Sequence, residues 1–233
     1  MFKSNKQLIL AAVALLTGSQ AFAGTFTSSV SATSDYIWRG ISLSGDDPSV
    51  GISGAYAFDN GFSLSAAANK VDFNSNGQNY ADAEVELLIT GAFTTKVRGA
   101  DVSLAATAYN YLDESTPDGW SEFSVGFDLP VSNANVGMEI KYSSDTLLGS
   151  GDTYTTFAHF AMPFTKSAVA ASVYYVDSKD VSEFFGSKDH YKGAELSYGY
   201  DWTPSLSTTL SYSYAVVPTG DNGLFGKVAY KIC

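Results

Sequence analysis

Apolar and polar side chains alternate along most of this chain, in segments of about ten residues. In residues 134–143, for example, Val136 and Ile140 hold even positions while Glu139 and Lys141 hold odd ones. Successive side chains of a β-strand point to opposite faces, so a period of two indicates a strand with one apolar face and one polar face. The pattern predicts an all-β protein.

About twelve such segments follow one another, and the connections between them are mostly long and short in turn. Asp59-Asn60-Gly61 is typical of a tight turn. Strands of about ten residues, tilted near 40°, span about 25 Å. These features predict a transmembrane antiparallel up-and-down β-barrel of about 12 strands. The predicted strands cover residues 26–42, 49–58, 62–68, 81–93, 101–111, 120–129, 134–143, 154–164, 167–176, 191–200, 206–215 and 224–233.

In the stretch from Ser34 to Ser42, aromatic residues alternate with charged ones. Tyr36 and Trp38 fall on the apolar parity, whereas Asp35 and Arg39 fall on the polar parity. We predict that this stretch is the upper half of the first strand, running out of a membrane with its aromatic side chains outward.

A second informative segment lies at residues 81–93. Asp82, Glu84 and Glu86 alternate there with apolar residues, and a slip of one residue would turn all three carboxylates to the wrong face. We therefore predict a column of three like charges along the wall of the lumen. Such a column would concentrate cations in an open pore.

The amino terminus predicts export from the cytosol. Lys3 and Lys6 precede an apolar run at 8–16, and Ala21-Phe22-Ala23 has the small-x-small form of a cleavage site. This is the layout of a secretory signal peptide, and the apolar run is too short for a spanning helix. We predict two parts, a signal peptide at 1–23 and an outer-membrane β-barrel at 24–233.

Composition narrows the class of protein. After predicted cleavage the chain keeps 11 basic and 24 acidic side chains, a net charge of −13, which argues against nucleic acid as a partner. Cys233 is the only cysteine, so an internal disulfide cannot stabilise the fold, and its role is left open. A secreted β-sandwich is the alternative, because it also alternates along many short strands.

Aromatic residues favour the barrel over the sandwich. They gather near the ends of the predicted strands, where the aromatic girdles of a membrane barrel lie. The candidate girdle residues are Tyr36, Trp38, Phe58, Phe62, Phe160, Phe164, Tyr198, Tyr200 and Trp202.

The sequence Ser34-Asp-Tyr-Ile-Trp-Arg-Gly-Ile-Ser42, shortly after the signal peptide, resembles the opening motif of the TorF-type porin family. Trp120-Ser-Glu-Phe123 is similar to a mid-chain strand of the same family. The resemblance implies a barrel in the outer membrane of a Gram-negative bacterium with a pore function, and it implies no established substrate. The chain departs from many outer-membrane proteins in ending on Cys233 instead of an aromatic residue.

Charged residues on the polar parity are candidates for the pore lining. They would set ion preference in an open channel, or pair across a narrow barrel and fill it. The acidic excess favours cations, and small hydrophilic solutes or ions are the expected cargo. Arg39 either narrows the outer mouth or neutralises carboxylates on neighbouring strands, and we favour the second. The candidates are Asp35, Arg39, Asp82, Glu84, Glu86, Glu122, Glu139, Lys141 and Glu195.

Catalysis is not expected. His159 and His190 are the only histidines, neither lies in a recognisable nucleophile motif, and no metal-ligand spacing or phosphate-binding loop is present. We predict no cofactor, and membrane lipid and diffusing solutes as partners. A structural or adhesive barrel and a lipid-modifying barrel enzyme remain as alternatives, and the oligomeric state is open. The connection 177–190 is either a gate or, as we favour, a solvated loop.

Overall fold

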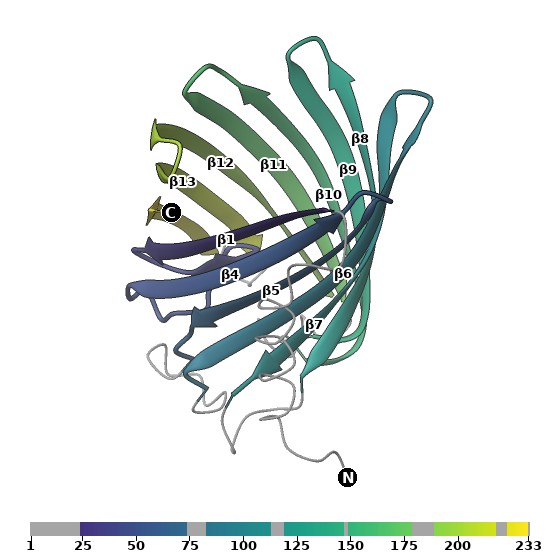
Figure 1. Ribbon diagram of the computed structural model, residues 1–233. Coiled ribbons are helices and arrows are strands. Elements are labelled where there is room, and N and C mark those ends of the chain that lie inside the picture. The colour runs from purple at the N-terminus through teal and green to yellow at the C-terminus, as the bar shows by residue number, and fades with distance from the viewer. Residues whose placement is uncertain are drawn as a thin grey trace.

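The structure is a computed structural model that describes residues 24–73, 83–112, 119–146, 149–178, 189–217 and 223–232. Strands account for nearly all of these residues (Figure 1). They are β1 (Gly24–Thr33), β2 (Ile37–Trp38), β3 (Ile41–Ser42), β4 (Ser49–Phe58), β5 (Phe62–Lys70), β6 (Val85–Val97), β7 (Ala100–Tyr111), β8 (Trp120–Val131), β9 (Ala134–Thr146), β10 (Gly149–Pro163), β11 (Ser167–Ser178), β12 (His190–Thr203), β13 (Leu206–Val217) and β14 (Gly223–Ile232).

Twelve of these strands form one closed antiparallel barrel in up-and-down order, as predicted. β1 pairs with β4 along its whole length, because β2 and β3 leave the barrel wall and pair only with each other. On its other side β1 meets β14 at Ala32–Ile232 and Thr33–Lys231, which closes the ring. A single closed sheet excludes the sandwich alternative, which needs two sheets packed face to face.

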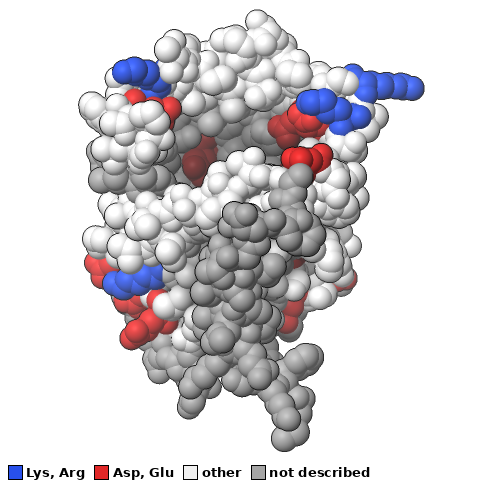
Figure 2. All heavy atoms as spheres, viewed as in Figure 1, with Lys and Arg blue, Asp and Glu red and all other residues white. Residues whose placement is uncertain are grey.

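The outer face of the barrel is apolar. Val30, Ile52, Val125 and Ile140 lie near the middle of their strands, and each keeps more than half of its surface exposed. On the face shown in Figure 2, charged side chains gather toward the two ends, and the uncovered part of the band between them has none. Exposed apolar surface this extensive is atypical of a soluble monomer and matches the band of a barrel that faces lipid.

Cross-strand register explains why the alternation produces these two faces. Val125 lies opposite Ile140, and Ser124 lies opposite Lys141, so apolar side chains meet outside and polar side chains meet inside. The same rule settles the orientation of β11, which is nearly all apolar. Tyr174 is buried toward the lumen, whereas Tyr175 is exposed.

The short connections are tighter than the sequence predicts. The sequence predicts a connection at residues 94–100, but β6 continues to Val97, and Arg98 and Gly99 alone form the turn, both with positive φ (53° and 89°). This is the form of a two-residue type I′ turn, whose twist matches that of the flanking strands. The predicted loop 144–152 is likewise wrong, because β9 and β10 extend to Thr146 and from Gly149.

At the loop end of the barrel, two predicted strand boundaries differ from the structure. The first strand ends at Thr33, so residues 34–42 are not its upper half. β6 begins at Val85, so Glu84 precedes the strand, and Asp82 lies outside the described residues. The described part of the chain contains no helix that is long and apolar enough to cross a membrane.

Candidate functional site: a hairpin inside the barrel

The segment between β1 and β4 folds inward at the loop end and forms a small hairpin of β2 and β3. Trp38 pairs with Ile41, and Ile37 pairs with Ser42. Arg39 and Gly40 form the two-residue turn with φ values of 49° and 81°, the left-handed geometry of a type I′ turn. We call residues 34–48 the lumenal hairpin.

Asp35 holds the base of the lumenal hairpin together. Its carboxylate accepts hydrogen bonds from the hydroxyls of Ser42 (2.5 Å) and Ser44 (3.1 Å), and its residue is nearly buried. The Ser44 Oγ also accepts the backbone N–H of Tyr36 at 2.9 Å. The Leu43 N–H donates to the Tyr36 carbonyl at 2.7 Å and closes the loop. Asp35 therefore stabilises the fold of the hairpin.

Arg39, at the hairpin tip, is fastened to the barrel wall. Its guanidinium forms an ion pair with Glu122 of β8 and donates to the Thr155 hydroxyl of β10 at 3.0 Å. The side chains of Arg39 and Glu122 are only 5% and 4% exposed. The guanidinium also lies over the Trp38 ring, 4.3 Å from its centre, and 5.6 Å from the centre of the Phe157 ring. Charge, hydrogen bonding and stacking thus hold one side chain in place.

Glu86 of β6 provides a second anchor. Its carboxylate accepts the hydroxyls of Tyr36 at 2.8 Å and of Tyr111 at 3.2 Å, and the residue is 1% exposed. Asn69 of β5 donates its amide to the Tyr36 hydroxyl at 3.4 Å. Burial and then the charge of Glu86 raise the pKa of Tyr36 far above its ordinary value, so this phenol stays protonated and remains a donor.

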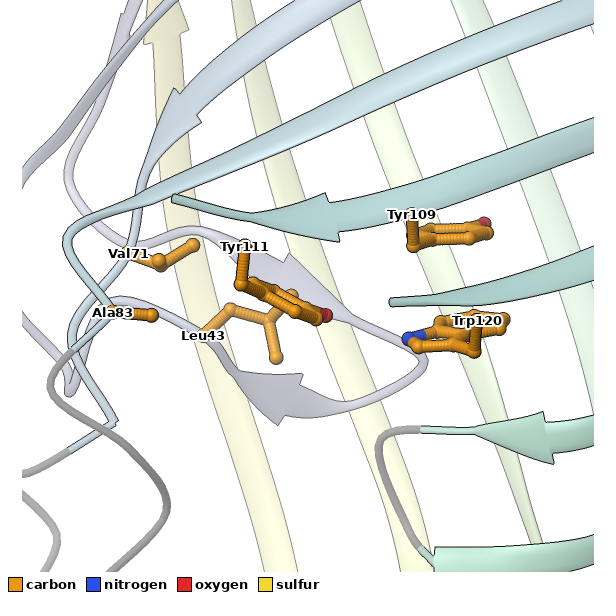
Figure 3. Packing of buried hydrophobic residues seen from close by; sticks show 6 residues of the cluster. All are labelled: Leu43, Val71, Ala83, Tyr109, Tyr111 and Trp120. Atoms are coloured by element: carbon orange, nitrogen blue, oxygen red, sulfur yellow. The ribbon is translucent and has the colours of Figure 1, made fainter. Parts of the chain in front are cut away.

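Aromatic packing fills the space between the hairpin and the wall (Figure 3). Trp120 stacks on Tyr109 with ring centres 3.7 Å apart, and it meets Trp38 edge-on at 5.9 Å. The Tyr109 hydroxyl donates to Glu122 at 3.0 Å. Leu43 packs into the same buried cluster with Val71, Ala83 and Tyr111, as Figure 3 shows.

A second buried cluster receives the opposite side of the tip. Trp38, Ile41 and Phe157 pack against Tyr174, Val176, Tyr191 and Ala215. Gly40 fits closely there, since a Cβ at this position would lie 2.6 Å from both the Ala215 Cβ and the Tyr174 hydroxyl. The absence of a side chain at Gly40 allows the tip to approach the wall.

Farther from the hairpin, lumenal charges also lie in pairs. His159 Nε2 is 2.6 Å from Asp128 Oδ1, and Lys141 Nζ is 3.4 Å from Glu139 Oε2. A Cβ at Gly137 would collide with the His159–Asp128 pair, so this glycine makes room for it. Among the described residues, no group of three or more His, Cys, Asp or Glu side chains could hold a metal ion.

Comparison with protein families identifies the chain. Residues 18–220 match the family described as "bacterial protein of unknown function (Gcw_chp)". The chain belongs to this family. The narrower resemblance to the TorF-type porins stays a prediction. A search of curated proteins found no match.

Several solved porins and outer-membrane channels have folds similar to this chain. The NanC porin aligns with a TM-score of 0.62 and 11% identity, over 88% of this chain and 97% of its own. The KdgM porin aligns with a TM-score of 0.59 and 9% identity, over 88% and 96%. An outer membrane channel from Pseudomonas putida F1 aligns at 0.53 and 8%, over 92% and 95%. At these identities the similarity establishes the fold.

Several predicted site residues lie elsewhere than expected. Tyr36 and Trp38 are not girdle residues, because both belong to the lumenal hairpin and pack inside the barrel. The described strands do not include the whole of the predicted acidic column, which stays a prediction. Of its three members Glu86 alone lies on a barrel strand, Glu84 is exposed in the connection before β6, and Asp82 is outside the described residues.

The remaining girdle candidates lie on or beside the short turns. Phe58 and Phe62 flank the β4–β5 turn, Phe160 and Phe164 adjoin the β10–β11 turn, and the others adjoin the β12–β13 turn. Phe62, Phe164 and Trp202 are each at least half exposed. A girdle role at this end of the barrel remains a prediction, for Phe58, Phe62, Phe160, Phe164, Tyr198, Tyr200 and Trp202.

The structure brings Arg39, Glu86 and Glu122 to one site around the hairpin and leaves Glu139, Lys141 and Glu195 on the wall. Tyr109, Tyr111, Trp120 and Thr155 complete the site and were missed. Their signal was present in the sequence, because Tyr109 and Tyr111 are aromatic residues on the otherwise polar parity. The connection 177–190 lies largely outside the described residues.

Proposed function

We propose that this protein is an outer-membrane channel through which small hydrophilic solutes or ions diffuse passively. One observation carries the proposal: a closed twelve-strand barrel turns apolar side chains outward and ionisable side chains inward. Among membrane-spanning forms, only helices and closed barrels satisfy every backbone hydrogen bond in lipid. A polar interior of this width suits water and solutes. The similar porin folds support the same function.

The lumenal hairpin sets the width of this channel. It crosses the lumen at the loop end, and the buried anchors at Glu86 and Glu122 hold it there. Long loops that fold into a barrel leave a constriction narrower than the wall would impose. The proposed channel therefore has a wide vestibule toward the short turns and a narrow zone beside the hairpin.

Localisation and selectivity form part of the same proposal. The predicted signal peptide at 1–23 directs the chain through the periplasm to the outer membrane of a Gram-negative bacterium, where lipid surrounds the barrel. We also propose a preference for cations. The Glu122, Glu139 and Asp128 carboxylates have basic neighbours, and the remaining lumenal acids leave an excess of negative charge on the described wall.

The proposal assigns no catalytic role. The His159–Asp128 pair is the arrangement closest to a catalytic one, but its Nε2, the nitrogen that would face a nucleophile, is held by Asp128. The densely packed hairpin favours one other function, a plugged barrel that conducts nothing and acts as a structural or adhesive protein.

Two measurements test the proposal together. In membrane fractions the protein should be in the outer membrane and show heat-modifiable gel mobility, as a folded barrel does. Liposomes containing it should swell in small neutral sugars at a rate that falls steeply as sugar size increases. Residence in the soluble periplasm would contradict the barrel function, and a membrane-inserted protein that gives no swelling and no ion flux would favour the plugged barrel.

A further inference from the structure

The polar anchors of the lumenal hairpin lie on one half of the ring. They come from β5, β6, β8 and β10, namely Asn69, Glu86, Glu122 and Thr155. The hairpin tip also packs against Tyr174 on β11, Tyr191 on β12 and Ala215 on β13. Aromatic side chains fill the space behind these anchors. Solute cannot pass through a space that is packed with buried side chains.

A cavity of about 210 Å³ lies beside the base of the hairpin, against β1, β4, β5, β12 and β13, and Tyr36 and Asn69 of the Glu86 anchor also line it. Its lining is rich in small polar groups, including Ser31 and Ser49 on the near strands and Ser211 and Ser213 on β13. Each water molecule takes about 30 Å³ in the liquid, so the cavity has room for about seven. It can therefore hold a small hydrated ion.

Two carboxylates line this cavity, and they differ in availability. Asp35 is buried and accepts hydrogen bonds from the Ser42 and Ser44 hydroxyls, so its carboxylate stabilises the hairpin. Glu195 lies on β12, opposite Ser213 in register, and its residue is exposed. Among the described side chains, no ion pair involves Glu195, in contrast to Glu122 and Glu139. Its charge is the one available to a solute in the cavity.

We propose that this cavity is the route past the hairpin, and that Glu195 makes the route selective for small cations, including solutes with an ammonium group. This inference rests on the proposed channel function. A carboxylate in a narrow zone beside a low-dielectric wall attracts cations and repels anions more strongly than it would in bulk water. The partly exposed hydroxyls of Ser31 and Ser211 on the same lining replace part of the hydration shell that a cation sheds on entry.

Reversal potentials in a tenfold gradient of potassium chloride test the inference. The wild-type channel should favour K⁺, Glu195→Gln should bring the K⁺/Cl⁻ permeability ratio severalfold closer to one, and Glu195→Lys should favour Cl⁻. Asp101→Asn is the matched control, because it removes the same charge at the short-turn end, where Asp101 is paired with Lys96 at 2.7 Å. It should change the ratio much less.

Lys227 lies on β14, next to β13, and offers a competing explanation of any ion selectivity. The β13–β14 ladder pairs it with Ser213, which is itself opposite Glu195. If Lys227→Gln changes the permeability ratio while Glu195→Gln leaves it unchanged, the selecting charge is Lys227 and the inference is wrong. A larger effect of Glu195→Gln than of Lys227→Gln supports it.

Cysteine modification tests the route itself. Ser211→Cys, made in a Cys233→Ser background, should react faster with a cationic than with an anionic methanethiosulfonate, and reaction should reduce conductance. Adding Glu195→Gln should remove the difference in rate. If the channel conducts but modification of the introduced thiol leaves the current unchanged, the proposed route is wrong and the channel function stands. If the wild-type barrel conducts no ions, the proposed channel function is wrong as well.

Discussion

Arg39 and Glu122 form the contact on which the site depends. Both side chains are almost fully buried, so removing one leaves an uncompensated charge inside the barrel. Breaking a buried pair in this way costs about 3–5 kcal/mol. We expect Arg39→Ala to lower the free energy of unfolding by about that amount, measured by urea titration in detergent micelles.

The exposed pair Lys96–Asp101 is the internal control for this prediction. Its side chains are 72% and 40% exposed, and such surface pairs contribute about 0.2–1 kcal/mol. Lys96→Ala should therefore cost much less than Arg39→Ala. Equal costs would mean that the Arg39 ion pair is solvated and does not anchor the hairpin.

Tyr36 links stability to pH. Its pKa is raised in the folded protein, chiefly by burial, above the value of about 10 that it has when unfolded. Above pH 10 the unfolded chain loses this proton while the folded protein keeps it, so folding stability falls by about 1.4 kcal/mol per pH unit for this group. Below pH 10 the contribution is fully present.

Tyr36→Phe removes that group and tests the sign. Between pH 10 and 11.5 the free energy of unfolding of the variant, measured by urea titration, should fall less steeply with pH than that of the wild type. The difference in slope should be about that of one titrating proton. Parallel curves over this range would show that Tyr36 titrates normally and is not a buried donor to Glu86.

At the scale of elements, the turn of the lumenal hairpin has a matched counterpart in the β6–β7 turn. Gly40 and Gly99 both have positive φ (81° and 89°), but a Cβ at Gly40 would collide with Ala215 and Tyr174, whereas a Cβ at Gly99 meets nothing within 4 Å. Gly99→Ala should cost about 1 kcal/mol of backbone strain. Gly40→Ala should cost a further 1–3 kcal/mol or so from overpacking, by thermal unfolding in micelles.

The same two variants distinguish backbone strain in the turn from displacement of the hairpin tip. Gly40→Ala should also make the hairpin region more sensitive to added protease, because a displaced tip loses its buried contacts. Gly99→Ala should leave that region as resistant as in the wild type. Similar stability and protease sensitivity in the two variants would mean that the tip is not packed against β11 and β13.

The barrel strands could be predicted from the sequence because apolar side chains that face lipid alternate with polar side chains that face the lumen. Val125 can be assigned to the outer face and Ser124 to the inner face from their positions in the sequence alone, without knowing which strands lie next to β8. The lumenal hairpin could not be assigned in this way. Tyr36 and Trp38 alternate with Asp35 and Arg39 equally well in a strand that leaves the membrane and in a hairpin that folds inward.

The interactions of the site were beyond sequence reasoning for a second reason. Glu86 and Glu122 fall on the polar parity of the sequence, but parity does not say which residues meet across the lumen. Arg39 reaches Glu122 and Thr155, which are 83 and 116 positions away in the sequence. Glycine after Arg39 was the local signal of a two-residue turn, because a type I′ turn needs positive φ at both central positions.

At the scale of the whole molecule, the apolar outer face should show a dependence on depth. Ile140 lies mid-strand and Val131 lies beside a short turn, and both are about half exposed. Ile140→Arg should cost about 2–4 kcal/mol on folding into lipid bilayers, whereas Val131→Arg should cost about 0–1 kcal/mol. Equal costs would mean that no hydrocarbon surrounds this face.

The central claim is that the barrel conducts through a lumen narrowed by the hairpin. Single-channel recording in planar bilayers tests it most directly, on the wild type and on a variant in which residues 36–43 are replaced by a short Gly-Ser linker. The wild type should show a small, steady conductance, and the variant a severalfold larger one, because the twelve-strand wall then sets the width. No current in the wild type, or equal currents in a folded variant, would contradict the claim.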